Sequence, residues 1–294
     1  MEAAFKRKNK GKIAPSSART YWANIRRLYK LSGGEGELPK THAWLKKSPL
    51  IAKVRKEKLN TQKLLGAAAV KIAQVYGVEV ANWSKLMETA STNYDKERNK
   101  GKATVREKTL MPKGGFEAVR KAAAKLRNQL PAKTESLRDL MQVQDAWLLS
   151  FYSKHTPRLI YDVEIGGRGA NKIVPAGKGF RIVLGRHKTS KSMGPSVIKL
   201  DKSLAPLTKR MIENSKRLTK HNRLLSAPRG GVMTQSGLSR RLSKITSKAL
   251  GRGFGTQILR VLRANSQSTD MKKVREYLNE MGHSLNQEKK YVAK

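Results

Sequence analysis

The chain has 294 residues, and its 63 Lys and Arg against 21 Asp and Glu give a formal net charge of +42. This length suggests two domains, and a positive charge of this size indicates a polyanionic partner, because it otherwise opposes compaction by self-repulsion. The chain contains no cysteine, which excludes a disulfide scaffold, a cysteine nucleophile and a zinc site with cysteine ligands.

Residues 1–15 are strongly basic and have almost no apolar content. We expect a flexible, disordered tail here, with Lys6, Arg7 and Lys8 as candidate DNA contacts. Three roles stay open for it: a solubilising segment, an arm that follows DNA phosphates, and a localisation signal. The tail lacks the apolar stretch that marks a secretory signal peptide.

Residues 16–98 show helical periodicity, with apolar residues at three- and four-residue steps. The predicted helices cover about residues 16–32, 60–76 and 84–100. We expect an all-helical domain whose aromatic residues form its core and whose outer faces are basic. On those faces, Arg26, Arg27 and Lys63 are candidate contacts to nucleic-acid phosphates.

Residues 99–131 are expected to connect the first domain to a second one. The stretch 99–114 is rich in Lys, Gly and Thr and breaks the helical pattern, which is typical of a linker. Helical periodicity resumes at Phe116 and ends at Pro131. The sequence therefore predicts a linker followed by a connecting helix.

Residues 132–294 form the expected second domain, which combines helices with a strand-like region. The predicted helices cover about 135–154, 204–218, 234–249, 255–264 and 270–281, and the predicted strands cover 159–165, 180–184 and 197–200. A basic turn over 186–195 joins the last two strands, which predicts a β-hairpin with Lys188 and Lys191 in its turn. Lys191 is also a candidate DNA contact. The fold class expected for the whole chain is mainly α with a small antiparallel β-sheet (α+β).

Several polar residues of the second domain follow one another in a distinctive order. Arg158 follows the long helix, Lys188 lies in the hairpin, and Gln257 and Arg260 stand three apart in Gln-Ile-Leu-Arg. Gly282-His283-Ser284 then begins 22 residues after Arg260, and Tyr291 follows His283 by eight positions. This order resembles that of the tyrosine recombinase (phage-integrase) family. That family is marked by an arginine, a hairpin lysine, a His-x-x-Arg box, a Leu-Gly-His-like box and a closing tyrosine.

The resemblance covers about residues 132–294, and its specificity lies in the joint order and spacing of the motifs. The stretch 224–234 also resembles the segment before the second box of the family. The helical region 16–98 is similar to the DNA core-binding domain of the family. The resemblance thus implies a helical core-binding domain followed by a tyrosine-recombinase-like catalytic domain, in a member similar to those of viruses or mobile elements.

The resemblance also implies roles for individual residues. The implied catalytic set is Tyr291, Arg158, Arg260, His283, Lys188 and Gln257. Tyr291 would attack the DNA phosphate, the two arginines would stabilise the transition state with bidentate forks, and no metal or other cofactor is implied. Lys188, or Lys191 in the same turn, would protonate the leaving 5′ oxygen, and His283 would bind the phosphate or assist proton transfer.

The same residues also have simpler interpretations. Arg158 and Arg260 could instead be phosphate contacts on a DNA-binding surface without catalysis, although the catalytic interpretation is favoured. His283 follows a glycine and could lie at a helix end, and Tyr291 could be an aromatic anchor of a last turn.

Three features depart from the family pattern. Gln257 stands where the second box usually has histidine, so a group that handles protons becomes an amide that only hydrogen-bonds. Asp162, four residues after Arg158, replaces the usual nearby glutamate, which leaves the support of that arginine open. Only three residues follow Tyr291, so a C-terminal helix that reaches a neighbouring protomer is not expected.

We therefore expect a site-specific DNA recombinase or integrase that acts on double-stranded DNA and self-associates on it. The alternatives are a basic DNA-binding or packaging protein that keeps the fold without the reaction, and a DNA-relaxing enzyme similar to type IB topoisomerases. No apolar run approaches the roughly 18 residues of a membrane span, so no membrane partner is expected. A small-molecule substrate is not expected either. The expected location is inside the cell with DNA, in the host cytoplasm or nucleus or in a virion.

Overall fold

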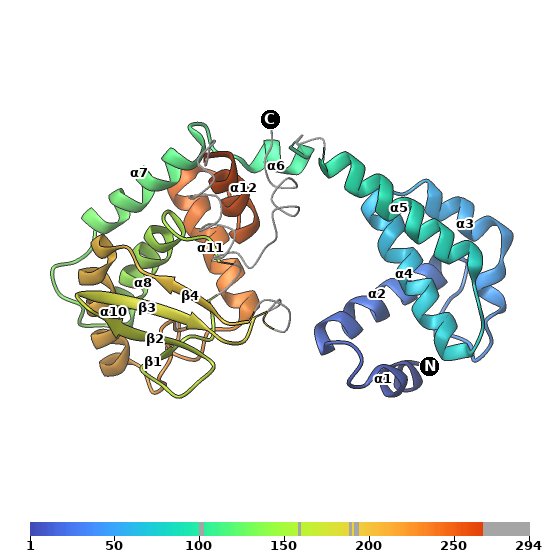
Figure 1. Ribbon diagram of the computed structural model, residues 1–294, viewed down its shortest axis with the longest axis horizontal. Helices are drawn as coiled ribbons and strands as arrows, with labels where there is room; N and C mark the ends of the chain where they lie inside the picture. Colours follow the sequence, from blue (N-terminus) through green and yellow to red (C-terminus); the bar gives the residue numbers. More distant parts are fainter. Residues whose placement is uncertain (100–102, 158–159, 188–189, 191–193, 267–294) are drawn as a thin grey trace. The chain divides into compact units, whose positions relative to one another are not determined.

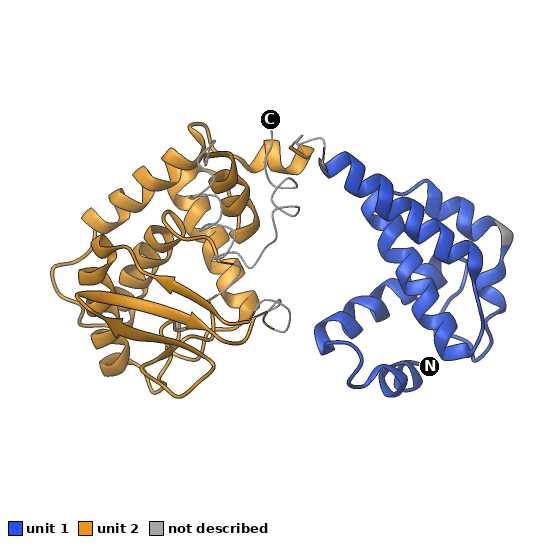
Figure 2. Cartoon of the chain, in the orientation of Figure 1, with its two compact units in different colours: residues 1–100 blue, residues 101–294 orange. Residues whose placement is uncertain are grey.

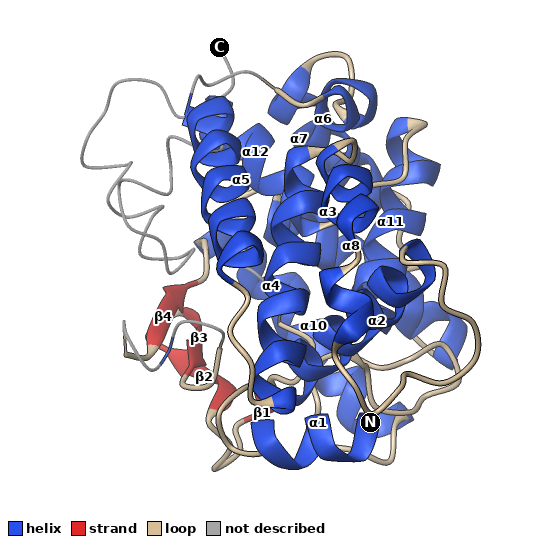
Figure 3. Ribbon diagram, turned by 90° about the vertical axis from the view of Figure 1, so that its right-hand side faces the viewer, coloured by secondary structure: helices blue, strands red, loops and turns tan. Residues whose placement is uncertain are grey.

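The computed structural model describes residues 1–294 except 100–102, 158–159, 188–189, 191–193 and 267–294 (Figure 1). The chain divides into two compact units, Met1–Lys100 and Gly101–Lys294, called unit 1 and unit 2 below (Figure 2). The described residues are mostly helical, and the strands gather in one small sheet (Figure 3). This confirms the predicted fold class. No helix among the described residues is both long enough and apolar enough to cross a membrane.

Unit 1 is helical throughout its described part. Its elements are α1 (Glu2–Asn9), α2 (Pro15–Leu31), η1 (Ala43–Lys46), α3 (Ser48–Arg55), α4 (Leu59–Tyr76) and α5 (Ala81–Asn99). Helix α4 packs against α5 and α2, and most of its buried residues are glycine or alanine. Gly66 is the closest point: a Cβ there would lie 3.0 Å from the Cβ of Met87 on α5. The three helices predicted for this region are confirmed.

The expectation of a disordered tail is wrong for Glu2–Asn9, which form helix α1. The side chain of Phe5 is fully buried, and its ring lies 5.7 Å from that of Trp22 on α2. Asn9 is also buried and donates a hydrogen bond to the Phe5 carbonyl at 2.9 Å. One aromatic anchor thus holds a helix whose average composition is typical of disorder.

Unit 2 is built around helix α8. Its helices are α6 (Val105–Leu110), α7 (Gly115–Asn128), α8 (Leu137–Tyr152), η2 (Lys202–Leu204), α10 (Ala205–Leu218), α11 (Gln235–Leu250) and α12 (Thr256–Ser266). A capping box of Ser136 and Asp139 begins α8, which packs against α7, α10 and α11. The five helices predicted between 116 and 264 are confirmed, and the one predicted at 270–281 lies outside the described residues.

The segment expected to be a linker and a separate connecting helix packs onto unit 2. Thr104 and Glu107 form a capping box that begins α6, and Arg252 donates hydrogen bonds to the carbonyls of Thr109 and Met111. Phe116 of α7 is buried in the core of unit 2. The expected domain start at residue 132 is therefore too late, because the arginine and the apolar side chains attach residues 105–128 to the same core.

The sheet of unit 2 has four strands in the order β1-β2-β3-β4. They are β1 (Glu164–Ile165), β2 (Asn171–Ala176), β3 (Gly179–Leu184) and β4 (Ser196–Lys199). The predicted hairpin is confirmed, since β3 and β4 pair antiparallel with Ile182 opposite Ile198. The sheet is mixed and not purely antiparallel, because β1 pairs parallel to β2. The strand predicted over 159–165 is reduced to the two residues of β1.

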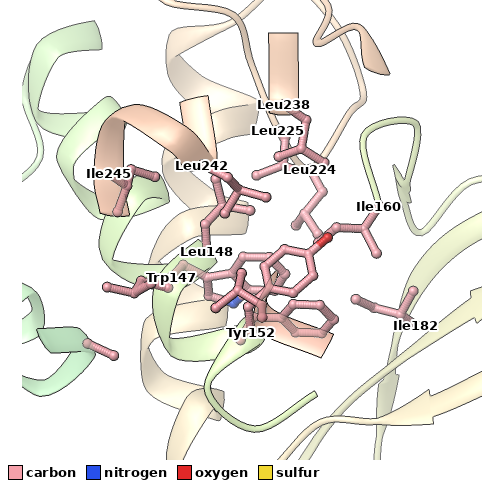
Figure 4. Packing of buried hydrophobic residues seen from close by; sticks show 14 of the residues in the cluster. Trp147, Leu148, Tyr152, Ile160, Ile182, Leu224, Leu225, Leu238, Leu242 and Ile245 are labelled. Atoms are coloured by element: carbon pink, nitrogen blue, oxygen red, sulfur yellow. The ribbon is translucent and has the colours of Figure 1, made fainter. Parts of the chain in front are cut away.

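One face of the sheet covers the core of unit 2. Ile173, Ile182 and Ile198 are buried there with residues of α8, α10 and α11. Figure 4 shows Trp147 and Tyr152 of α8 among aliphatic side chains that include Ile182 and Leu242. The opposite face is partly open and carries Arg181 directly across from Lys199, both exposed. The sheet thus separates an apolar interior from a cationic surface.

Candidate functional site

Two of the six predicted catalytic residues, Gln257 and Arg260, are among the described residues. Arg158, Lys188, His283 and Tyr291 lie outside them, as does Lys191. The structure therefore neither brings the six together nor separates them. What it shows is how the described elements around these sequence positions are held.

Helix α12 places Arg260 in the interior and Gln257 on the surface. The two residues are one turn apart, yet Gln257 is exposed whereas Arg260 is 4% exposed. Ile258, Leu259 and Val261 are buried on the same helix, which explains why it packs so deeply. An arginine is always charged at neutral pH, so burying it costs free energy unless it is compensated. Such a residue is typical of a functional site or of a buried polar network.

The charge of Arg260 acts on Tyr152, the last residue of α8. Tyr152 is fully buried, and its hydroxyl has no hydrogen-bond partner among the described residues. Burial raises the pKa of Tyr152 well above its ordinary value, and the positive charge of Arg260 opposes this rise. Arg158 follows Tyr152 by six residues, so the segment that carries the first predicted arginine starts beside the helix that carries the second.

The C-terminal end of α8 is fixed by contacts to the segment after β4 and to α10. His155 is buried, and its Nε2 accepts a hydrogen bond from the main-chain amide of Asp201 at 3.2 Å. The indole of Trp147 donates to Thr208 Oγ1 of α10 at 2.8 Å and its ring stacks on Phe151 at 5.0 Å. These contacts fix the position of the last turn of α8 and of the residues up to His155 that follow it.

Asp201 is itself held by its neighbours. Its carboxylate accepts a hydrogen bond from the Ser203 amide at 2.9 Å and pairs with Lys154 at 3.2 Å. The hydrogen bonding from Ser203, together with that from Lys154, lowers the pKa of Asp201 to about 2. The carboxylate therefore stays charged throughout the neutral range.

A second polar cluster lies around Asp162, the residue that replaces the glutamate found near the first arginine in the family pattern. Its carboxylate accepts a hydrogen bond from Asn171 at 2.8 Å and lies 3.9 Å from the guanidinium of Arg186. Its main-chain carbonyl accepts a hydrogen bond from Arg223 at 2.6 Å, and the same arginine pairs with Glu164 at 3.2 Å. The described contacts of Asp162 are thus with β2, with the base of the β3–β4 connection and with the segment after α10.

A third polar cluster fixes the segment before α11. Gln144 of α8 is fully buried and accepts hydrogen bonds from the amide of Ser226 at 3.1 Å and from Arg241 at 2.9 Å. Arg241 also donates to Asp145 at 2.6 Å and to the Ser226 carbonyl at 2.9 Å. Helix α11 is therefore locked to α8, and α12 follows it directly. Sequence reasoning missed this cluster, because its members are far apart in the chain.

The predicted DNA contacts of unit 1 have different surroundings. Lys6 pairs with Glu2 at 2.7 Å, Arg27 pairs with Glu57 at 2.7 Å, and Lys63 lies 5.7 Å from the Tyr94 ring centroid. Lys8 donates a hydrogen bond to the carbonyl of Gln74, and Arg7 and Arg26 are exposed. The hydrogen bond from Lys6 lowers the pKa of Glu2, and the charges of Lys6 and Arg26 act in the same direction. Lys6 and Arg26 therefore gather on the side of unit 1 where α1 meets α2.

Two helices present basic outer faces. On α2, the exposed residues include Arg19, Arg26 and Lys30, which recur at helical spacing. On α11, Arg240, Lys244 and Lys248 are exposed at four-residue steps, Ser239 and Ser247 are exposed beside them, and the helix has no acidic residue. Such faces can bind phosphates, and the serine hydroxyls add hydrogen-bonding groups.

Two solved structures are similar to nearly the whole chain. One is the crystal structure of XerA recombinase, with 12% identical residues and a TM-score of 0.41 over 100% of this chain and 92% of that one. The other is a pre-cleavage complex of XerH site-specific recombinase bound to its difH substrate, with 14% identity and a TM-score of 0.44 over 95% and 93%. No family model and no curated protein matches the sequence. With identities and TM-scores this low, neither similarity assigns an activity or a residue role to this chain.

Proposed function

We propose that this chain is a site-specific recombinase or integrase that breaks and rejoins double-stranded DNA through a covalent 3′-phosphotyrosine intermediate. The observation that carries the proposal is the burial of Arg260 on α12, where its charge acts on the end of α8. The sequence order from Arg158 to Tyr291 names this arginine as one of a catalytic pair. A buried guanidinium at that position is what a transition-state donor requires, because a dry site strengthens its interaction with developing charge.

The proposed reaction uses side chains alone. The Tyr291 oxygen bonds to phosphorus as the bond from phosphorus to the 5′ oxygen breaks, so one phosphodiester replaces another. The phenol proton passes to His283 or to water, and Lys188 or Lys191 gives a proton to the leaving 5′ oxygen. Arg158 and Arg260 stabilise the extra negative charge of the phosphorane, and Gln257 adds a hydrogen bond. Attack by the freed 5′ hydroxyl on the phosphotyrosine reverses these steps and rejoins the strand.

The positive charge of the chain supports the proposed binding of double-stranded DNA. The basic outer faces of α2 and α11 would contact phosphates of the duplex and hold it for cleavage. We propose further that protomers associate on DNA, and that the chain acts inside the cell as part of a virus or mobile element.

The proposal is tested with labelled duplexes of randomised sequence that carry nicks at varied positions, so that a strand end cleaved close to a nick diffuses away. Wild-type protein should form an adduct that survives denaturing electrophoresis, and Tyr291→Phe should form none. Tyr21→Phe, in unit 1, serves as the matched control and should keep the adduct. No adduct with wild type would favour a non-catalytic DNA-binding protein. Relaxation of supercoiled plasmid without sequence preference would favour a topoisomerase-like enzyme.

A further inference from the structure

Asn171, the first residue of β2, makes an unusual set of contacts for a strand residue. Its side chain is 6% exposed. The amide nitrogen donates hydrogen bonds to the Asp162 carboxylate at 2.8 Å and to the Arg186 carbonyl at 3.0 Å, and the amide oxygen accepts one from the Arg186 main-chain amide at 2.9 Å. One carboxamide therefore satisfies both main-chain groups of Arg186 and also binds a carboxylate from another segment.

These contacts extend the sheet beyond its last strand pair. Asn171 lies opposite Leu184 at the end of the β2–β3 ladder, and Arg186 lies two residues further on. Between them, the amide of Gly185 donates to the carbonyl of Ala170 at 2.8 Å, and a Cβ at Gly185 would lie 2.7 Å from that oxygen. The start of the β3–β4 connection is thus held at two consecutive residues, by a main-chain bond and then by the carboxamide.

The other end of the arrangement is the segment after α8. Asp162 is held by Asn171 on its carboxylate and by Arg223 on its carbonyl, at 2.6 Å. In the sequence, Arg158 precedes Asp162 by four residues and Lys188 follows Arg186 by two. Asn171 therefore joins Asp162 to Arg186. In the sequence, these two residues lie close to the predicted catalytic cations Arg158 and Lys188.

Only a carboxamide can make this set of bonds. It carries a two-proton donor and an acceptor side by side, whereas a carboxylate lacks the donor and a hydroxyl lacks the reach to bind both main-chain groups of one residue. A buried polar side chain also costs free energy unless it is hydrogen-bonded, and here both ends of the amide are bonded. The residue type is thus explained by the geometry.

We propose that Asn171 is a positioning residue for the general acid of strand cleavage, an inference that rests on the proposed function. It would act by fixing where the β3–β4 connection leaves the sheet relative to Asp162. Lys188 and Lys191 both belong to this connection, so the inference holds for either lysine. Proton transfer to the leaving 5′ oxygen requires hydrogen-bond distance, and a small displacement of the connection would therefore slow this one step most.

The test compares two DNA substrates. In the first, the leaving atom is the ordinary 5′ oxygen. In the second, a bridging 5′ sulfur replaces it, and this thiolate leaves without a proton, because a thiol has a pKa of about 8.5 against about 15.7 for water. Lys188→Ala and Lys191→Ala show which lysine is the acid, since its loss should be rescued by the sulfur substrate.

Asn171→Ala should lower single-turnover cleavage of ordinary DNA about 100-fold and of the sulfur substrate less than about fivefold. Asn171→Asp, which is nearly the same size but cannot donate, should give the same pattern. Lys172→Ala, the next residue of β2, is the matched control and should change neither rate. The ratio of the two rates within one preparation does not depend on its active fraction, so partial misfolding cannot produce the pattern.

Equal loss on both substrates, or no loss on ordinary DNA, would overturn the role of Asn171. Wild-type protein that cleaves neither substrate would overturn the proposed function instead, which keeps the two failures distinct.

Discussion

The positive charge of Arg260 on α12 acts on the buried hydroxyl of Tyr152 at the end of α8 and opposes the rise in pKa that burial causes there. The two residues are far apart in the sequence. Their interaction links α12, which carries the predicted catalytic Arg260, to α8, which precedes the predicted catalytic Arg158 in the chain.

Arg260→Lys should lower the rate of adduct formation about 100-fold while DNA affinity changes less than about threefold. Lysine keeps the charge but loses the planar fork that binds two phosphate oxygens at once. Arg263→Lys, on the same helix, is the control, because the guanidinium of Arg263 lies over the Phe116 ring at 5.5 Å. Single-turnover cleavage and DNA-binding titrations check both variants. Equal rates for the two would remove Arg260 from the catalytic set.

Tyr152→Phe should leave the free energy of unfolding unchanged or raise it by about 1 kcal/mol. Burying the hydroxyl costs desolvation free energy, and no hydrogen bond to a described residue offsets this cost. Phenylalanine removes the hydroxyl and fills nearly the same space. Tyr76→Phe is the contrast, because the Tyr76 hydroxyl donates a hydrogen bond to the Pro39 carbonyl at 2.8 Å. Its removal should lower the free energy of unfolding. Urea unfolding measures both. A clear loss of stability for Tyr152→Phe would show that its hydroxyl is bonded.

The pH dependence of stability should include a contribution from Asp201. Its pKa is lowered from 3.8 to about 2 in the folded state, so the charged form is stabilised by folding. That contribution is fully present above the ordinary pKa and is lost as the pH falls from about 4 towards 2. Because the carboxylate is partly exposed and screened, Asp201→Asn should cost less than about 1 kcal/mol at pH 7.

Thermal unfolding of wild type and Asp201→Asn between pH 7 and pH 3 makes this comparison. The difference between them should shrink below pH 4. A difference that grows as the pH falls would contradict the lowered pKa.

Gln substitutions at Arg240 and Lys244 should weaken DNA binding and flatten its salt dependence. Both residues are exposed on α11, and each neutralised phosphate contributes roughly 0.9 to the slope of log affinity against log salt. The double variant should therefore reduce the magnitude of the slope by about 2. Lys209→Gln is the control, because Lys209 lies beside Glu213 on α10. An unchanged slope for the double variant would place the duplex elsewhere.

Gly66→Ala should destabilise unit 1 by about 1–2 kcal/mol. The new Cβ would lie 3.0 Å from the Cβ and 3.2 Å from the Cα of Met87, so α4 and α5 would have to separate. This cost exceeds the gain of about 1 kcal/mol that alanine brings to a helix interior. Calorimetry of the full chain measures the effect, and a stabilised variant would show that the two helices pack less closely.

Much of the fold was predictable because its helices have strong periodicity. The stripe with Ile25 and Leu28 on α2, and the apolar positions around Arg260 on α12, repeat at helical spacing and are buried as expected. The β3–β4 hairpin was predictable from the alternation of Phe180, Ile182 and Leu184. In each case the signal is local, because it comes from the spacing of apolar residues within one element.

The missed elements depend on contacts that the sequence does not show. The apolar anchor of helix α1 is the single residue Phe5, which leaves no helical periodicity to detect, and β2 contains Pro175, which argues against a strand. Asn171 has no local signature, because its role arises from Arg186 and Asp162. The roles of Arg158, Lys188, His283 and Tyr291 stay predictions, since these residues lie outside the described part of the chain.

The central claim is that Tyr291 becomes covalently bound to DNA. Digestion of the purified adduct with protease and nuclease, followed by mass spectrometry of the modified peptide, measures this directly. The account predicts a single modified residue, Tyr291, carrying a 3′-linked nucleotide. Modification of another residue, or the absence of any modified peptide from wild-type protein incubated with the randomised nicked duplexes, would contradict it.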